Sequence, residues 1–264
     1  MSVITLTTEW RPDDIYAGII KGRICSLIPG ATIVDNASGL PSFNIPYASF
    51  IIRNTFTYYP LGSIHIICVG SEAGKGSRHL AVKAKGHYFI GTDNGIFHLI
   101  LNSAPDEAIV LEMSKERSEL DIFAETAAEI LSGKNLTDIG PQITDTVEKV
   151  PLRATIDKEI ILGSVIFIDS YGNAFTNITK DIFFRVFENK PYKIIIQSNR
   201  NYISTINNKY CDVSDGELLA RFNHLNLIEI AINGANVSEL FNLEIGSSVR
   251  IELSDETIRK NGLF

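Results

Sequence analysis

Acidic side chains follow the first apolar stretch of the chain. Val3 to Thr7 is short and β-rich, which predicts a buried strand, and Glu9 and Asp14 come shortly after it. Ligands of open α/β sheets bind outside the carboxyl ends of the strands. Carboxylates there can accept two hydrogen bonds from a ribose diol or pair with an ammonium group. The simpler interpretation is that Asp14 caps a helix beginning at Ile15 and that Glu9 is solvated.

Two polar turns have a similar character. Asp93 and Asn94 follow a strand predicted at Tyr88 to Thr92 and precede a glycine, a composition typical of tight turns with positive φ. Asp169 and Asn173 lie in a comparable segment of the second half of the chain. An aspartate with asparagines supplies acceptors and amide donors that suit an amine and a purine edge. Turn chemistry alone also explains both segments.

A glycine-rich segment, Gly70 to Arg78, follows the strand predicted at Ser63 to Val69. Its spacing does not fit a nucleoside-triphosphate loop, because too few residues separate Gly70 from Gly74 and Lys75 is followed by glycine. We predict instead a flexible loop that borders a pocket.

The sequence has no pattern that favours metal or serine-hydrolase chemistry. Its five histidines are scattered, without a His-Glu-x-x-His motif or a cysteine pair at zinc spacing, and no Gly-x-Ser-x-Gly elbow is present. Asp121 and Glu125 lie one turn apart in a predicted helix, where a solvated face explains them better than a metal. We expect neither a metal nor a separate cofactor.

The composition of the chain indicates which kinds of partner to expect. The 264 residues are 45% hydrophobic, enough for a packed core, and carry a formal net charge of -7. An acidic chain without a basic run has poor electrostatics for phosphate backbones or anionic lipid, so we expect neither nucleic acid nor a membrane as partner. The three cysteines are far apart, the first residues lack a signal-peptide pattern, and no apolar stretch approaches the roughly 20 residues of a membrane span. These features predict a cytoplasmic protein.

The order of the predicted elements divides the chain in two. As far as the strand predicted at Ser63 to Val69, strands and helices alternate in a rhythm typical of βαβ units and a largely parallel sheet. Further strands, the last at Ile109 to Met113, precede a helix predicted at Leu120 to Leu131. Thr137 to Asp157 is irregular and polar, and beyond it strands follow one another with few helices, which indicates an antiparallel sheet or small barrel. We therefore predict an α/β domain at 1–150, with a mostly parallel sheet flanked by helices, and a smaller, mainly antiparallel β domain at 151–264.

Taken in order, these segments resemble those of the S-adenosyl-L-methionine hydroxide adenosyltransferases and the related fluorinases and chlorinases. The family begins with a Thr-Asp-Phe-Gly segment and then Asp-x-Tyr-Val-Gly, which here read Thr8-Glu9-Trp10-Arg11 and Asp14-Ile15-Tyr16-Ala17-Gly18. Later segments of the family match Gly62-Ser63-Ile64-His65, Asp93-Asn94-Gly95 and Leu227 to Ala231. The resemblance covers nearly the whole chain in order, so several weak motifs form one specific pattern.

The resemblance implies a homotrimer that binds a nucleoside substrate between the first domain of one subunit and the second domain of a neighbour. Glu9 would hold the ribose hydroxyls, Phe43 would pack on the nucleoside, and Asn173 would read the adenine edge. Asp14 and Asp169 would meet the methionine amine. The matched motifs place further residues at the substrate: Tyr16, Asp93, Asn94, Ala231 and, at the position that binds the carboxylate, His224.

The implied reaction is a displacement at the ribose 5′ carbon of S-adenosylmethionine, which gives adenosine and L-methionine when water is the nucleophile. Methionine leaves as a neutral thioether, so no general acid is needed. The reaction requires a desolvated nucleophile that is held in line with the breaking bond.

The catalytic set departs from the family pattern. Hydroxide-using members carry an Asp-Arg-His set that prepares water. Here the aspartate position falls on Gly70, Arg78 keeps the arginine, and the histidine is lost from the segment that reads Arg117 to Asp121. Glu72 and Glu119 could replace the missing base, so Arg78, Glu72 and Glu119 are the candidate catalytic residues. Halogenase features are missing as well, and a glutamate at Glu119 would repel a halide.

Three functions remain open at this point. The first is a hydrolase that splits S-adenosylmethionine with Glu72 or Glu119 as the base. The second is a protein that binds S-adenosylmethionine or adenosine in the same cleft without turnover, and the third is a purely structural trimer. Two glutamates near one cleft favour the enzyme, because carboxylates in a semi-enclosed site can act as bases. The loss of several signature positions favours the binding protein.

Overall fold

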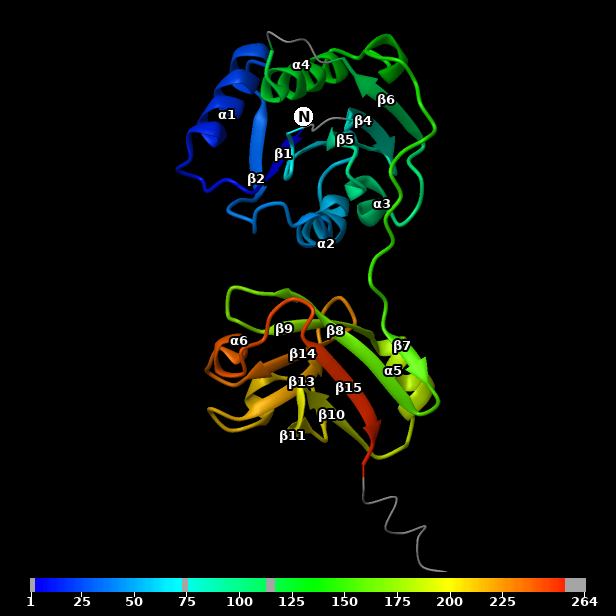
Figure 1. Ribbon diagram of the computed structural model, residues 1–264. Coiled ribbons are helices and arrows are strands. Elements are labelled where there is room, and N and C mark those ends of the chain that lie inside the picture. Colours follow the sequence, from blue (N-terminus) through cyan, green and yellow to red (C-terminus); the bar gives the residue numbers. More distant parts are fainter. Residues whose placement is uncertain (1–2, 73–75, 113–116, 255–264) are drawn as a thin grey trace, which may run out of the picture. The chain divides into compact units, whose positions relative to one another are not determined.

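The computed structural model describes residues 3–72, 76–112 and 117–254. Met113, the last residue of one predicted strand, and residues 73–75 of the glycine-rich segment lie outside these described residues. The chain divides into two compact units, Met1–Pro151 and Leu152–Phe264 (Figure 1). Each unit has a hydrophobic core of its own.

The first unit contains a mixed sheet. Its described strands lie in the order β2-β1-β3-β5-β4-β6. The neighbours within β2-β1-β3-β5 pair in parallel, whereas β4 pairs antiparallel with both β5 and β6. The predicted parallel arrangement therefore holds for one part of the sheet only. The bounds of the strands are β1 Val3–Thr8, β2 Thr32–Ala37, β3 Ile64–Cys68, β4 His79–Ala84, β5 His87–Thr92 and β6 Glu107–Leu111.

A tight hairpin explains the antiparallel part of this sheet. Only Lys85 and Gly86 connect β4 with β5, and both have positive φ values, 51° and 77°. A two-residue connection with positive φ at both positions joins antiparallel strands, because a parallel pair needs a crossover of a dozen or more residues.

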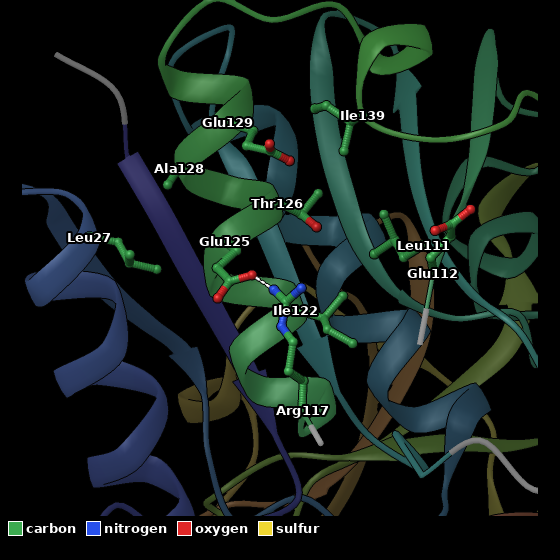
Figure 2. A pocket seen from close by; sticks show the side chains of 10 residues that line it. All are labelled: Leu27, Leu111, Glu112, Arg117, Ile122, Glu125, Thr126, Ala128, Glu129 and Ile139. Carbon is green, nitrogen blue, oxygen red and sulfur yellow. Dashed lines mark ion pairs between the residues drawn. The ribbon is translucent and has the colours of Figure 1, made fainter. Parts of the chain in front are cut away.

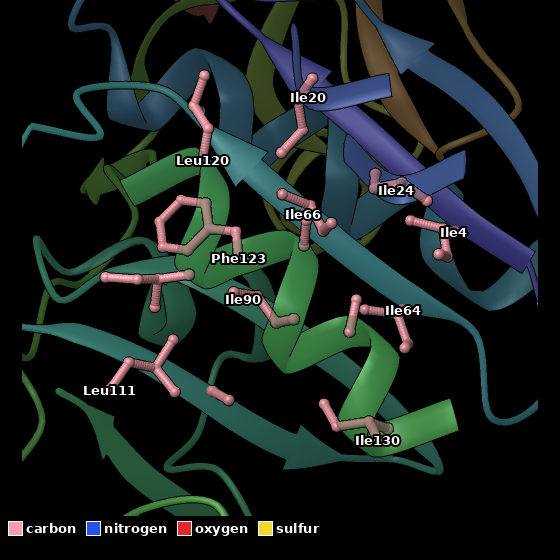
Figure 3. Close-up of a cluster of buried hydrophobic side chains, with 14 of the residues drawn as sticks. Ile4, Ile20, Ile24, Ile64, Ile66, Ile90, Leu111, Leu120, Phe123 and Ile130 are labelled. Carbon is pink, nitrogen blue, oxygen red and sulfur yellow. The ribbon is translucent and has the colours of Figure 1, made fainter. Parts of the chain in front are cut away.

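Helices cover both faces of the first sheet. One core cluster packs side chains of α1 and α4 against the strands, and Figure 3 shows Ile20, Ile24 and Phe123 meeting strand residues there. A second cluster packs α2 and α3 on the other face. The bounds are α1 Ile15–Leu27, α2 Ile45–Thr55 with the 3-10 turn η1 Phe56–Tyr58, α3 Ile96–Leu101, α4 Glu119–Leu131 and the 3-10 turn η2 Leu136–Asp138.

Side-chain caps begin the three longest helices of this unit. Asp14, Asn44 and Ser118 accept hydrogen bonds from backbone N–H groups in the first turns of α1, α2 and α4, respectively. Such caps satisfy donors that have no partner within the helix. The sequence-based expectation that Asp14 caps the first helix is confirmed.

The second unit is built mainly from antiparallel strands. Its sheet has the order β11-β10-β15-β8-β9-β14-β13-β12, with β7 paired to β8, and the described pairings are antiparallel except for β12 with β13. The helix α5 packs Phe183, Val186 and Phe187 into the core of this unit. The bounds are β7 Thr155–Asp157, β8 Ile160–Ile168, β9 Ala174–Thr179, α5 Lys180–Phe187, β10 Tyr192–Ile196, β11 Ser198–Ile203, β12 Ile206–Asn207, η3 Tyr210–Asp212, β13 Leu218–Phe222, β14 Leu227–Ile232, α6 Val237–Leu240 and β15 Ser248–Leu253.

A search of the described helices finds none with the length and apolar character needed to cross a membrane.

Candidate functional site

Three loops at the carboxyl ends of the central strands meet at Glu9. It follows β1, and its backbone N–H donates to the carbonyl oxygen of Cys68 at the end of β3 at 3.2 Å. Its Oε2 accepts from the backbone N–H of Phe43 at 2.7 Å, and its Oε1 accepts from that of Gly70 at 3.4 Å. The loops after β1, β2 and β3 thus meet at one carboxylate, where open α/β sheets bind ligands.

Phe43 is held in an unusual conformation beside Glu9. Its φ is 60°, which is uncommon for a bulky residue, and its side chain is 76% exposed. The hydrogen bond to Glu9 and the start of α2 two residues later fix the backbone there. Local strain of this kind is found at ligand sites, and an exposed ring at a strand-end loop fits the stacking role that the resemblance implies.

Glu119 lies close to the same strand end. Burial raises the pKa of the Cys68 thiol, and the charges of Glu119 and Glu9 raise it further. Leu120, the next residue of α4 after Glu119, packs in the same core cluster as Cys68, so the start of α4 lies near the end of β3. Cys68 itself is fully buried and remains a neutral thiol. Of the predicted site residues, the structure brings Glu9 and Phe43 into contact.

Arg78 and Asp93 form an ion pair next to this edge. Arg78 Nη2 lies 2.8 Å from Asp93 Oδ2, and the side chain of Asp93 is only 2% exposed. The other oxygen of Asp93 accepts from the backbone N–H of Val147 at 2.9 Å. Arg78 also pairs with Asp145, and the hydrogen bond to Asp93 is the main cause of its raised pKa. Both oxygens of the Asp93 carboxylate are engaged within the chain.

Asn94 and Glu72 occupy different surroundings. Asn94 donates from Nδ2 to the carbonyl oxygen of Val69 at 3.4 Å and accepts from the N–H of Ile96 at 3.2 Å, which ties the end of β3 to α3. Glu72 is exposed beside the part of the loop that lies outside the described residues.

Asp14 and Tyr16 lie at the start of α1. Asp14 Oδ1 accepts from the backbone N–H of Tyr16 at 3.1 Å. The ring of Tyr16 is 48% exposed and lies 5.4 Å from that of Trp10, just beyond Glu9. The cap leaves one oxygen of Asp14 available to an amine.

In the second unit, Asp169 organises the turn that holds Asn173. Its Oδ1 accepts from the backbone N–H groups of Tyr171 and Asn173, both at 2.9 Å, and its Oδ2 accepts from Asn173 Nδ2 at 3.0 Å. Gly172 has a φ of 82°, and a Cβ there would lie 1.8 Å from Asn236 Oδ1. The turn is therefore a fixed structure whose sequence requires glycine.

Ala231 lies near this turn, whereas His224 is on a separate loop. Ile230 pairs with Ala174, so the backbone of Ala231 runs beside Asn173. The side chain of Ala231 is fully buried, which leaves only its main-chain groups for recognition. His224 is exposed in the turn between β13 and β14.

An acid–phenol pair between the exposed Tyr210 and the buried Glu229 was not predicted from the sequence. Tyr210 Oη donates to Glu229 Oε1 at 2.5 Å, and Glu229 is 2% exposed in β14. Burial raises the pKa of both groups, that of Tyr210 to about 12, and the charge of Asp169 contributes in the same direction. A single glutamate within the apolar strand Leu227–Ile232 was the available signal.

A surface pocket of about 450 Å³ lies along α4 and beside β6 (Figure 2). Figure 2 shows an ion pair between Arg117 and Glu125 at this pocket. No predicted site residue is among its described lining residues. The described part of the chain also contains no group of three histidine, cysteine, aspartate or glutamate side chains that could hold a metal ion.

Comparisons with known proteins agree with the two-unit division. Residues 4–140 match the family model of the SAM hydroxide adenosyltransferase N-terminal domain, and residues 163–250 match that of the C-terminal domain. An (R)-S-adenosyl-L-methionine hydrolase of Thermus thermophilus is 25% identical over 269 residues, which cover 95% of this chain and 100% of that protein. A protein of the same name from Methanocaldococcus jannaschii is 26% identical over 274 residues, which cover 95% of this chain and 96% of that protein.

The fold has a counterpart among solved structures. The crystal structure of an uncharacterized conserved protein from Thermotoga maritima matches with a TM-score of 0.83 at 24% identity, and the match covers 94% of this chain and 99% of that one. The two family models together span most of the sequence, in the order of the two units. The chain belongs to the SAM hydroxide adenosyltransferase family.

Proposed function

We propose that this chain hydrolyses S-adenosyl-L-methionine to adenosine and L-methionine. The observation that carries the proposal is the carboxylate of Glu9 at the end of β3, where the loops that follow three strands of the first unit converge. The names of the Thermus and Methanocaldococcus relatives support the same reaction.

In the proposed reaction, the oxygen of water forms a bond to the ribose 5′ carbon while the bond from that carbon to sulfur breaks. The electron pair of the broken bond returns to sulfur, so methionine leaves as a neutral thioether. The proton of the attacking water passes to the carboxylate of Glu119. Glu9 uses one acceptor position on each oxygen for backbone N–H groups, which leaves the remaining lone pairs for the ribose hydroxyls.

The second unit supplies the remaining contacts in this proposal. Asn173 presents its side-chain oxygen and one amide hydrogen to the adenine edge, because the other hydrogen is donated to Asp169. The substrate would lie between the first unit of one copy and the second unit of a neighbouring copy in a homotrimer. No separate cofactor takes part.

The test is product analysis with labelled water. Incubation with S-adenosylmethionine in H₂¹⁸O should release adenosine that carries ¹⁸O at its 5′ hydroxyl, together with unlabelled methionine. Glu119→Gln should reduce the rate by about 10²–10⁴, the usual contribution of a general base. Glu72→Gln is the matched variant, and a larger loss there would assign the base to Glu72 instead. Absence of adenosine release from the unmodified chain would refute the hydrolase.

Binding without turnover is the second candidate. It is favoured by the ion pairs of Arg78, because its guanidinium already contacts two aspartates. Titration calorimetry with S-adenosylmethionine and with adenosine separates the two functions. Measurable binding of either ligand without product release would establish the binding protein, and no heat with either would exclude both.

A further inference from the structure

The connection between the two units is bonded to β6, the last strand in the order of the first sheet, and to α3. Ile143 donates its backbone N–H to Ala108 at 2.9 Å, and Val110 donates to Pro141 at 3.0 Å. Further on, His98 Nε2 and Thr146 Oγ1 lie 2.8 Å apart. The chain is thus held along β6 and α3 before it leaves the first unit.

The strongest attachment involves Arg78 and Asp93. Arg78 Nη1 lies 3.3 Å from Asp145 Oδ2, and its Nη2 donates both to Asp93 Oδ2 and to the backbone carbonyl of Asp145. Asp93 completes the arrangement by accepting from the N–H of Val147. We refer to Arg78, Asp93, Asp145 and Val147 as the linker clasp.

The burial of Asp93 explains why the linker clasp requires particular hydrogen-bond donors. The Asp93 side chain is 2% exposed, so its charge is tolerated only with well-placed donors, and Arg78 and the N–H of Val147 supply them. The Asp145 carboxylate is 79% exposed, so its ion pair adds little stability by itself, and its part is to orient Nη1 of Arg78. The bond from Arg78 to the Asp145 carbonyl and the bond from Val147 to Asp93 therefore carry most of the attachment.

Lys149 extends the contact. A Cβ placed on Gly95, whose φ is 94°, would lie 2.5 Å from Lys149 Cδ. The side chain of Lys149 therefore lies directly over the turn that carries Asp93. The positive φ of Gly95 also favours glycine at this turn.

We propose that Asp93 and Asp145 are positioning residues, which hold Arg78 in place and through it fix the segment Asp145–Val147 to the edge of the site. The position of Arg78 and the point at which the chain leaves the first unit are therefore coupled. The inference rests on the proposed function for its catalytic consequence, whereas the clasp itself is a property of the first unit.

The clasp can be tested without catalysis by limited trypsin digestion of the full chain. The exposed Lys149 follows the clasp, so opening of the clasp should speed cleavage after it. Arg78→Gln should accelerate this cleavage about tenfold, because it removes the charge-assisted bonds to both aspartates. Arg78→Lys should have an intermediate effect, because an ammonium group can pair with Asp93 but lacks the fork that also spans Asp145. Asp145→Ala should have a smaller effect, because its carbonyl remains.

Glu148→Ala is the control, since Glu148 is exposed in the same segment and is not part of the clasp. Cleavage rates equal to the unmodified chain in both Arg78 variants would overturn the clasp, whether or not the chain hydrolyses S-adenosylmethionine. In an active chain, Asp145→Ala should lower kcat with an unchanged melting temperature, while Glu148→Ala leaves both unchanged. An unchanged kcat in Asp145→Ala would overturn the positioning role of Asp145.

Discussion

Gly172 shows how a single position fixes the turn that presents Asn173. Gly172 has a positive φ, and the space that a Cβ would need is already filled by Asn236 Oδ1. Gly172→Ala should destabilise the second unit by about 2–4 kcal/mol, because it adds a steric clash to the backbone strain. Gly234→Ala is the matched control, since Gly234 has a φ of 76° but open space around its Cα. Equal urea-unfolding midpoints for the two variants would contradict this account.

Several residues of the candidate site in the first unit were selected from the sequence by their resemblance to the family's motifs. Glu9 and Phe43 could be selected because they occupy matched positions in a collinear series of motifs, and the structure brings them into contact. Asp93 was selected for the same reason, but the sequence could not reveal that Arg78 and Val147 occupy its carboxylate. Such pairings join distant parts of the chain, so local pattern contains no information on them.

At the scale of elements, three strands are linked by a buried polar chain. Thr5 Oγ1 and His65 Nδ1 lie 2.7 Å apart, and His65 Nε2 and His87 Nδ1 lie 3.2 Å apart, which connects β1, β3 and β5. Burial and, to a smaller extent, the charge of His87 lower the pKa of His65 from 6.5 to about 3. The histidine is therefore neutral in the folded chain over a range where it is protonated in the unfolded chain.

This difference predicts a pH dependence of stability. Between pH 6.5 and about 3 the unfolded chain binds the extra proton, so the contribution of His65 is complete above pH 6.5 and is lost as the pH falls. The free energy of unfolding should fall by about 1.4 kcal/mol for each pH unit in this range. Urea unfolding from pH 7.5 to 4.5 should show a shallower decline for His65→Asn than for the unmodified chain. The exposed His224→Asn should retain the original slope, and identical slopes for all three proteins would refute the assignment.

The elements that sequence reasoning found are those with a clear local signal. The apolar strands β1 and β3 and the capped helices α1 and α4 agree with prediction within a few residues. The helices α3 and α5 and several strands of the second unit were not predicted. α3 spans only Ile96–Leu101 and its side chains are almost all buried, so it lacks the polar face that distinguishes a helix from a strand.

At the scale of the whole molecule, the proposal that neighbouring copies share each site can be tested by mixing inactive variants. Glu9→Ala should disable the first unit, and Asn173→Ala should disable the second, so each variant alone should release little adenosine. Random co-assembly of the two into trimers leaves about a quarter of all shared sites intact, or about one site in three within the mixed trimers, and activity should recover to about that fraction.

Recovery of activity distinguishes a site shared by two copies from a site within one chain. A site within one chain always contains one of the two substitutions, so mixing cannot restore it. Co-expression with two different affinity tags, followed by tandem purification, would isolate the mixed assemblies, and native mass spectrometry would give their stoichiometry. Each variant, refolded without the other, provides the baseline activity. Mixed trimers that remain at this baseline would place both halves of the site in a single chain, while mixed dimers with recovered activity would retain the sharing and reject the trimer.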